Sequence, residues 1–447
     1  MLWWSGSRTA TRMKAQGKRS PAEPEDLLPR RSTAGGFKAM RDTGLYEQIL
    51  GLTPPWRVSG VAMDKEAETI TVRVELPAGA TLACPACGRA GCAIKDRQER
   101  SWRHLDTCQF KTLISAPLPR TECPDCGVKT IAPPWAQKHS RFTLLMERLA
   151  IDALLEMSIQ GACRLLRLTW DEADGIIARA VGRGLARRDL SKLRRIGIDE
   201  KAVLKGQHYI TVVHDLETAK VVWMGEDRTE ETLDRFFESL PEGVLGRIEC
   251  VTMDMWQPYR ASCRKWIDGA EEKTVLDRFH LERHLNEAVD KVRKQEHRQL
   301  QSQGIELLKG TKWDWLYHPE NLPPTREPRF EYVRQFELKT VRAHAIKETF
   351  RHFWRYVYPA NARRFFRRWY FWATHSRLAP IIDVAKMFHR HLERIITFFT
   401  LDATNSTAEG INNKIQTIKK KAYGFRNVGR FINAIYFHCG GLELHPL

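Results

Sequence analysis

The stretch Arg247-Ile248-Glu249-Cys250-Val251-Thr252-Met253-Asp254-Met255-Trp256 runs from apolar, partly β-branched residues to a single carboxylate and then to a helical pattern. A similar run, Leu193–Glu200, also reaches an acid, Asp199. Buried strands read as continuous apolar runs, and ligands collect at the carboxyl ends of such strands. The two runs therefore predict neighbouring strands that hold a divalent metal between Asp199 and Asp254.

The segment around these two runs has an α/β rhythm. A helix over Glu230–Leu240 separates the third of five predicted strands from the fourth. Three strands before the first helix indicate an antiparallel meander, with parallel strands after it. This order favours an RNase H-like fold over a Rossmann fold, and the segment has no glycine-rich phosphate loop. The predicted strands are Arg195–Asp199, His208–His214, Lys220–Met224, Ile248–Met253 and Thr274–Leu276.

The whole chain of 447 residues is strongly basic, with 72 Lys and Arg against 54 Asp and Glu and a formal net charge of +18. That excess favours a polyanionic partner, most simply nucleic acid, because neutralising phosphates releases counterions. No apolar window is long enough for a transmembrane helix, and no secretory signal is present, so we expect no membrane partner and a cytoplasmic location. The length indicates several domains.

Two short cysteine motifs predict a zinc site. Residues 1–40 have a disordered, basic composition, and residues 41–135 form the first folded domain, starting with a β-hairpin over Trp56–Leu76. Cys84-Pro85-Ala86-Cys87-Gly88 and Cys123-Pro124-Asp125-Cys126-Gly127 follow, with residues 88–122 between the two pairs. Each motif places two thiolates on a tight turn, so together they supply a closed Cys₄ set for structural Zn²⁺.

Residues 136–192 are predicted to form a helix-turn-helix. Thr169 with Glu172 forms a capping box, which starts a second helix that is rich in arginine. We expect Asp171–Arg188 to be the recognition helix. A simple packing hairpin is the alternative, and the basic run favours DNA. The candidate DNA-binding residues of this helix are Arg183, Arg187 and Arg188.

The last third of the chain is helical and then polar. Residues 285–400 are crowded with aromatic and basic side chains, which mostly indicate a helix-bundle core with arginines reaching outward. Residues 401–447 begin with a helix near Ser406 that carries Glu409 and Asn412. Its basic continuation supplies further candidate DNA-binding residues, Lys414, Lys419, Lys420 and Arg426.

Three carboxylates from separate segments can hold two Mg²⁺ ions, which activate a water or 3′-hydroxyl and stabilise the leaving oxygen in an in-line phosphoryl displacement. Asp199 and Asp254 are two of the three acids. Spacing alone leaves the third open, since Glu409, Asp277 and Glu200 all qualify.

From about Leu45 to Gly441 the chain resembles the DDE transposases of the bacterial ISL-three insertion-sequence family. The resemblance covers the two cysteine motifs, Trp102-Arg103-His104-Leu105-Asp106, Ile196–Glu200 and Met253–Tyr259. It continues through Asp277-Arg278-Phe279-His280 and the block from Asn405 to Asn427. Each motif is modest alone, but their order is specific.

The resemblance implies a multidomain α+β protein with a zinc ribbon, a helix-turn-helix and an RNase H-like core (193–284 and 401–447) interrupted by the helical insertion (285–400). It implies Asp199, Asp254 and Glu409 as the catalytic triad for Mg²⁺ or Mn²⁺. Trp256, Asp277, His280 and Asn412 become supporting residues.

The implied activity is cleavage and joining of DNA at terminal inverted repeats, with double-stranded DNA as partner, in a bacterial, nucleoid-associated protein. We expect a homodimer, because two DNA ends must be joined. One departure concerns Gln416, where such families often carry Lys or Arg two helical turns past the catalytic Glu. An inactive DNA-binding regulator and an RNase H-like nuclease or resolvase are therefore the alternative functions.

Overall fold

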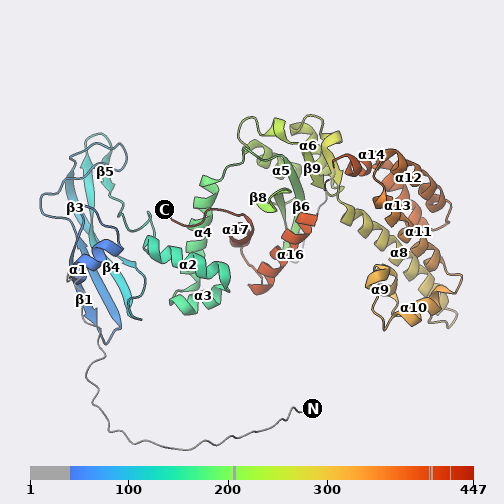
Figure 1. The fold of residues 1–447 in the computed structure, drawn as a ribbon, viewed down its shortest axis with the longest axis horizontal. Coiled ribbons are helices and arrows are strands. Elements are labelled where there is room, and N and C mark those ends of the chain that lie inside the picture. Colours follow the sequence, from blue (N-terminus) through green and yellow to red (C-terminus); the bar gives the residue numbers. More distant parts are fainter. Residues whose placement is uncertain (1–40, 205–207, 402, 404–405, 423, 447) are drawn as a thin grey trace, which may run out of the picture.

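The computed structural model describes residues 41–446, apart from 205–207, 402, 404–405 and 423. The basic arm predicted over residues 1–40 lies outside the described residues. The molecule is elongated, with a β-rich module at one end and a bundle of helices at the other (Figure 1). A three-helix module and a second sheet lie between these ends. No helix in the described part of the chain is long and apolar enough to cross a membrane.

The β-rich module consists of one helix and a five-stranded sheet of order β1-β2-β4-β3, with β5 on β4. The predicted hairpin is present as the antiparallel pair β1–β2. Trp102 and Trp135 pack edge to face in the core of the module. The elements are α1 (Asp42–Ile49), β1 (Arg57–Asp64), β2 (Thr69–Glu75), β3 (Ala93–Arg103), β4 (Lys111–Cys123) and β5 (Gly127–Thr130).

The three-helix module follows the expected boundaries closely. It contains α2 (Leu144–Glu156), α3 (Ile159–Leu166) and α4 (Trp170–Arg187). The predicted capping box is confirmed, since the backbone N–H of Thr169 donates to the Glu172 carboxylate while the Thr169 hydroxyl accepts from the backbone of Glu172. This reciprocal pair satisfies two N–H groups that have no partner within the helix.

The second sheet has the order β10-β9-β6-β7-β8. The predicted meander is confirmed, because β6–β7 and β7–β8 are antiparallel, and β9 and β10 add on as parallel strands. The strands are β6 (Arg195–Leu204), β7 (His208–Asp215), β8 (Lys220–Glu226), β9 (Cys250–Met253) and β10 (Thr274–Leu276). The helical elements of this region are α5 (Glu230–Glu238), the 3₁₀ turn Leu245–Arg247, α6 (Gln257–Trp266) and α7 (Ala270–Lys273).

The end of β6 differs from its prediction. We expected this strand to stop at Asp199, whereas β6 continues to Leu204. The reason is its pairing: the parallel ladder with β9 is recorded only as far as Gly197, but β7 stays hydrogen-bonded along the rest of β6. Asp199 therefore lies inside a strand, beyond the ladder shared with β9.

The helical region begins with the long helix α8 (Arg278–Gln301), which runs through the boundary predicted at residue 284. The hydrophobic core of the helical region contains fully buried aromatic side chains such as Trp315, Phe353 and Phe366, as expected from the sequence. The other elements are α9 (Lys312–Leu316), the 3₁₀ turn Pro319–Asn321, α10 (Glu327–Arg334), α11 (Lys339–Phe350), the 3₁₀ turn Arg351–Arg355, α12 (Pro359–Thr374), α13 (Ala379–Arg390), α14 (Leu392–Ile396) and α15 (Phe398–Leu401).

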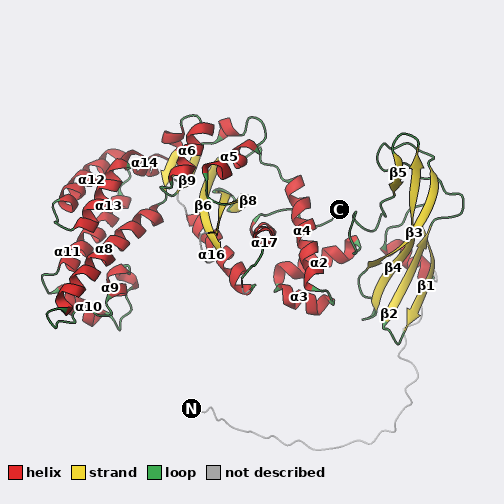
Figure 2. Ribbon diagram, turned by 180° about the vertical axis from the view of Figure 1, so that it is seen from behind, coloured by secondary structure: helices red, strands yellow, loops and turns green. Residues whose placement is uncertain are grey.

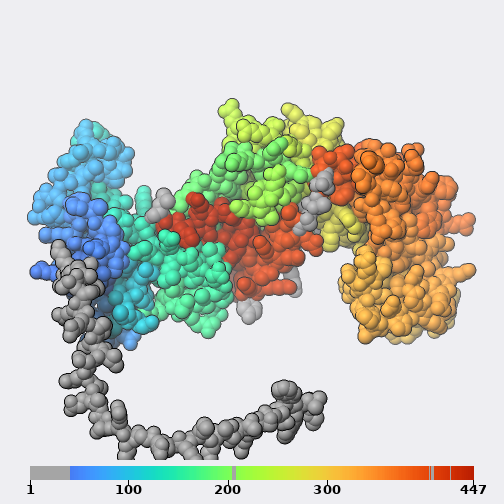
Figure 3. Space-filling model, in the orientation of Figure 1, coloured from blue at the N-terminus to red at the C-terminus, as the bar shows by residue number. Residues whose placement is uncertain are grey.

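The last two helices, α16 (Ser406–Lys421) and α17 (Val428–Cys439), return to the middle of the molecule. They lie between the three-helix module and the second sheet in both ribbon views (Figures 1 and 2), and the C-terminal segment fills this position in Figure 3. One hydrophobic core contains residues of α2–α4, the sheet and both C-terminal helices. The C-terminal helices therefore join the three-helix module to the sheet that carries the predicted acids.

Candidate metal centres and DNA-binding surfaces

The four predicted zinc ligands converge in the β-rich module. The Sγ atoms of Cys84, Cys87, Cys123 and Cys126 all lie within 4.8 Å of one another. The Sγ atoms of Cys87 and Cys123 are 3.7 Å apart. Zinc–sulfur bonds of about 2.3 Å in a tetrahedron place sulfur atoms about 3.8 Å apart, so the cluster has the size that Zn²⁺ requires.

The turns around these cysteines prepare the thiolates for a metal. Gly88 and Gly127 both have a positive φ, which lets each turn close behind its second cysteine. Backbone N–H groups of Cys87 and Ala86 lower the pKa of the Cys84 thiol to about 7. The predicted structural zinc site is thus confirmed in its donors and its geometry.

The arginines predicted for the recognition helix make contacts within the chain. Arg183 donates to Glu147, which is buried, and to the backbone oxygen of Leu444. Arg187 donates to the backbone oxygen of His445. These residues tie α4 to the C-terminal segment, but Arg187 stays exposed, and a role of the two arginines in binding DNA remains a prediction.

Arg188 is likewise used inside the chain, where it donates to the backbone oxygen of Val222 on β8. Burial lowers its pKa, although the nearby Tyr436 opposes this shift. These contacts have a physical reason. The C-terminal half of α4 contributes to a hydrophobic core shared with the sheet, so it packs against other elements of the chain.

The predicted acids lie around the ends of the ladders that β9 forms with its two parallel neighbours. Asp254 follows β9 and Asp277 follows β10, and the backbone N–H of Asp277 donates to the backbone oxygen of Met253 at 2.9 Å. The β6–β9 ladder ends at the pair Gly197–Thr252, so Asp199 lies two residues beyond it, in the part of β6 that pairs with β7. The three carboxylates therefore come from three adjacent strands of the sheet.

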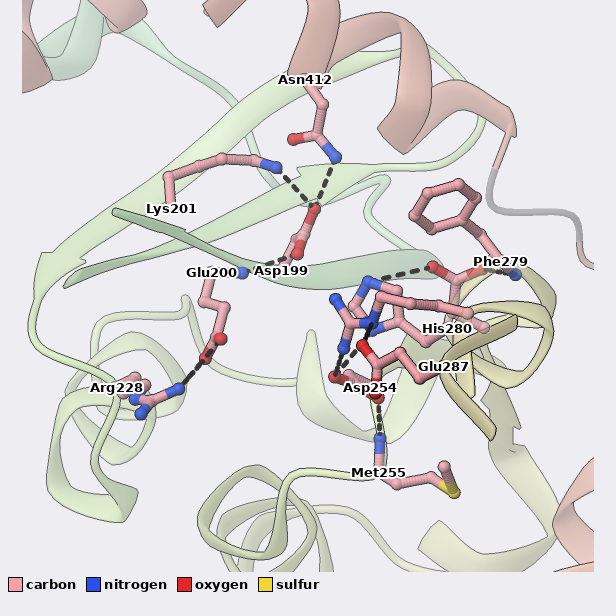
Figure 4. A network of polar contacts seen from close by, with 12 residues as sticks. Asp199, Glu200, Lys201, Arg228, Asp254, Met255, Phe279, His280, Glu287 and Asn412 are labelled. Atoms are coloured by element: carbon pink, nitrogen blue, oxygen red, sulfur yellow. Dashed lines mark hydrogen bonds and ion pairs between the residues drawn. The ribbon is translucent and has the colours of Figure 1, made fainter. Parts of the chain in front are cut away.

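Asp199 is held from two other parts of the chain. Asn412 Nδ2 on α16 donates to its Oδ2 at 2.6 Å, and Lys201 Nζ lies 3.4 Å from the same oxygen (Figure 4). Glu200 points away, with both carboxylate oxygens about Arg228 at 3.0 and 3.1 Å. Successive side chains of a strand point to opposite faces, so Glu200 pairs with Arg228 on the other face of β6 from the Asp199–Asn412 contact.

Arg228 is itself fixed between two aromatic rings. Its guanidinium lies 4.0 Å from the ring centroid of Tyr209 and 4.4 Å from that of Trp256. The Trp256 indole N–H donates to the backbone oxygen of Arg228 at 2.9 Å. Trp256 thus supports the pocket indirectly, by holding the cation that pairs with Glu200.

Asp254 is paired with two basic side chains of α8. His280 Nδ1 lies 2.7 Å from Asp254 Oδ2, and Arg283 Nη2 lies 3.6 Å from the same oxygen. Burial, the largest single effect, would raise the pKa of Asp254, but His280, the backbone N–H of Met255 and Arg283 together outweigh it and the net pKa is lowered. The carboxylates of Asp254 and Asp277 together raise the pKa of His280 against the effect of its burial.

Asp277 caps α8 by accepting a hydrogen bond at 2.9 Å from the backbone N–H of Phe279. Its Oδ2 is also 3.8 Å from His280 Nε2. His280 therefore lies between the carboxylates of Asp254 and Asp277, and Asp277 serves to fix the start of the helix that carries it.

A cavity of about 660 Å³ joins these elements and is lined by Asp199, Asp277, Glu409 and Asn412. Glu409 is exposed at its edge. Among the described residues, only the four cysteines form a cluster of three or more ligands within metal-binding reach of one another. Asp254 does not line this cavity but contacts two side chains that do, His280 and Arg283, so the three predicted acids do not form one cluster.

Sequence reasoning missed two cations of this region. Lys201 lines the cavity, and its place could be inferred from strand alternation, because it lies two residues after Asp199. Arg283 lies three residues after His280 on α8, which places both on one helix face. The predicted Lys419 is engaged elsewhere, since Nζ donates to the backbone oxygen of Ala202 at 3.0 Å.

Three segments of the chain match domains of transposases, and these matches define the class of the protein. Residues 196–435 match the ISL3 family domain described as a transposase, and residues 131–181 match the helix-turn-helix domain of transposase family ISL3. Residues 81–126 match the zinc finger of the transposases of IS204, IS1001, IS1096 and IS1165. The first match covers more than half of the chain, and the chain belongs to the ISL3 family of DDE transposases.

Two similar proteins extend the comparison over most of the chain. The transposase for insertion sequence element IS1001 of Bordetella parapertussis is 27% identical over 398 residues, which cover 87% of this chain and 96% of the relative. The transposase for IS1557 of Mycobacterium tuberculosis is 24% identical over 423 residues, covering 87% and 93%. The chain is a DNA-binding transposase of an insertion sequence.

Proposed function

We propose that this transposase binds the terminal inverted repeats of its own insertion sequence, cleaves the 3′ ends and joins them to target DNA. The observation that carries this proposal is the position of Asp199, Asp254 and Asp277 on three adjacent strand segments, beside a cavity that Asp199, Asp277 and Glu409 line. An RNase H-like core accounts for this arrangement, and the sheet order β10-β9-β6-β7-β8 supports it.

The proposed division of labour follows the predicted domains. Residues 41–135 and 136–192 bind DNA, and residues 193–284 and 401–447 form the catalytic core. Residues 285–400 form a helical insertion into the core, which is joined to it through α8. A homodimer is part of the proposal, because transposition joins two DNA ends.

We assign Asp199, Asp254 and Glu409 as ligands of Mg²⁺ or Mn²⁺. Hard carboxylate oxygens are the donors these ions prefer, and Asp199 and Asp254 come from the adjacent strand segments β6 and β9. When bound, a pair of such ions would activate the attacking oxygen and stabilise the leaving oxygen of an in-line displacement. The donor chemistry therefore fits the proposed ions.

The neighbouring side chains have positioning roles in this scheme. Asn412 orients the carboxylate of Asp199 and fixes α16, which carries Glu409, against β6. His280 orients Asp254 through its Nδ1. Lys201 and Arg283 supply positive charge beside the carboxylates, where a DNA phosphate has to approach.

The proposal is tested with purified protein and a labelled duplex from the flank of its own gene, with and without Mg²⁺. Omitting Mg²⁺ is preferable to adding a chelator, which would also remove zinc. We expect Mg²⁺-dependent nicking at the repeat boundary, lost in Asp254→Asn while DNA binding is kept. Asp268→Asn is the matched control, because Asp268 is an exposed aspartate of the same region.

Two outcomes would count against the proposal in different ways. Full cleavage by Asp254→Asn would remove that residue from the catalytic triad. Tight binding without nicking by the unaltered chain would identify an inactive, DNA-binding copy, and Gln416→Lys would then test the one departure from the family pattern.

A further inference from the structure

A second, larger cavity lies beside the catalytic region. It is a groove of about 1260 Å³ between the helix-turn-helix and the C-terminal helices. One wall comes from the α2–α3 turn, α3 and the start of α4, and the other comes from α16, α17 and the turn between them. The groove is thus formed jointly by the segments that match the helix-turn-helix and transposase domains.

The charged side chains that line the groove are all basic. Its lining contains five Lys or Arg side chains and no Asp or Glu. Arg430 is neutralised by ion pairs with Asp171 and Asp174 at 3.2 and 3.1 Å. The other four are exposed and have no acidic partner within the described part of the chain: Lys414, Lys420, Lys421 and Arg426. A groove with this charge favours a polyanion.

The apolar part of the wall suits a nucleic acid as well. Trp170, at the first position of α4, is 41% exposed and faces this groove. Ile159 and Phe425 line the groove near it. Sugar edges and bases can pack against such side chains while the flanking cations hold phosphates.

Helix α16 connects this groove to the catalytic cavity. Its first half contributes Glu409 and Asn412 to the cavity, and its second half contributes Lys420 and Lys421 to the groove. Asn413 lines both. Glu409 and Lys420 are eleven positions apart, which corresponds to about 16 Å of helix, or about five base pairs of DNA.

We propose that this groove holds the duplex at the end of the insertion sequence, with its phosphates on Lys414, Lys420, Lys421 and Arg426, a role that rests on the proposed function. In this arrangement the helix-turn-helix contacts the duplex through α3 and the start of α4. The arginines in the C-terminal half of α4 instead hydrogen-bond to other segments of the chain. Helix α16 sets the distance between the bound duplex and the carboxylate of Glu409.

The first test compares two triple variants that remove the same charge. Lys414→Gln/Lys420→Gln/Lys421→Gln alters the groove, and Lys291→Gln/Lys312→Gln/Lys386→Gln alters exposed lysines of the helical region. Each is titrated with a fluorescent duplex from the flank of the chain's own gene, without Mg²⁺, over a series of salt concentrations. Binding needs no catalysis, so the result is independent of the cleavage assay.

For the groove variant we expect at least tenfold weaker binding and a smaller salt dependence, by about 3 in the slope of log K against log salt, since each phosphate contact contributes about 0.9. The control variant should keep the slope of the unaltered chain. Equal behaviour of the two variants would overturn the proposal and would point to an acidic protein segment as the occupant. If the unaltered chain did not cleave DNA but the groove variant still bound DNA more weakly than the control, the proposed function would fail and the assignment of the groove would stand.

A cross-linking experiment tests the position of the duplex directly. Cys108 is exposed and Cys163 lines the groove, so both are first replaced by Ser, and then Lys420→Cys is combined with duplexes that carry a thiol tether on single phosphates. We expect disulfide formation about five base pairs from the cleaved bond, and none with Lys386→Cys. No cross-link from position 420 at any phosphate would contradict the proposal even if binding were weakened.

Discussion

Asn412 of α16 donates a hydrogen bond from its Nδ2 to Oδ2 of Asp199 on β6 at 2.6 Å, across 213 positions of the sequence. The contact joins the strand that carries the first predicted acid to the helix that carries Glu409 (Figure 4). Because the two acids come from opposite ends of the catalytic region, their relative position depends on contacts of this kind. The first prediction tests that dependence.

Replacing Asn412 with Ala should lower the cleavage rate by about 10- to 100-fold, the usual cost of losing a partner that orients a metal ligand. The Mg²⁺ concentration for half-maximal cleavage should rise, while the affinity for DNA should stay within twofold. Asn321→Ala, at an exposed position of the helical region, is the control. An unchanged Mg²⁺ dependence in the Asn412 variant would remove its positioning role.

Local sequence patterns predicted the parts of this protein that are built by neighbouring residues. The cysteine turns and the Thr169–Glu172 capping box depend on groups a few residues apart, and both are present. The order of the sheet was also predictable, because three strands before the first helix leave few other arrangements. The β6–β9 ladder, whose last pair is Gly197–Thr252, ends two residues before each of the predicted acids Asp199 and Asp254.

Contacts between distant segments were not predictable in this way. Arg183 looked like a DNA contact because a run of arginines on a helix indicates charge but not direction, and its partner Leu444 lies 261 positions away. The use of Lys419 by the backbone of Ala202 is hidden from the sequence for the same reason. The side-chain partner of Asp199 also required the folded chain.

The cysteine cluster predicts a selective response to substitution. Cys87→Ser should release the zinc and loosen the β-rich module, since metal binding and folding are coupled in small zinc sites. Cys108→Ser should keep the zinc, because Cys108 lies outside the cluster. Native mass spectrometry gives the metal content, and limited proteolysis reports the order of residues 80–130. Retention of zinc by the Cys87 variant would show that this thiolate is not a ligand.

Gly197 on β6 has no room for a larger side chain. A methyl group at Gly197 would overlap the ring of His214 at Nε2 and Cε1, and His214 is only 1% exposed. Gly197→Ala should therefore lower the stability of the sheet by about 1–3 kcal/mol, the usual cost of overpacking a core. Gly60→Ala, a strand glycine with open space around it, is the control. Urea midpoints that do not differ between the variants would contradict this account.

The acid dependence of stability should depend on His104. This side chain is 2% exposed, its Nδ1 is 2.9 Å from the Thr143 hydroxyl that caps α2, and burial lowers its pKa to about 4, with Arg103 adding to the shift. The unfolded chain, with a histidine pKa of about 6.5, then binds more protons between those values. Stability should therefore fall as the pH decreases from about 6.5 to about 4, by at most about 3 kcal/mol.

His104→Gln cannot take up that proton, so its unfolding temperature should depend less steeply on pH over this range than that of the unaltered chain. Burial also lowers the pKa of His214 to about 4. His214 is present in both the unaltered chain and His104→Gln, so part of the pH dependence of stability should remain in the variant. His139→Asn, at an exposed position with a positive φ that Asn tolerates, is the matched control and should leave the slope unchanged. Identical pH profiles for the unaltered chain and His104→Gln would show that His104 takes up no proton on unfolding.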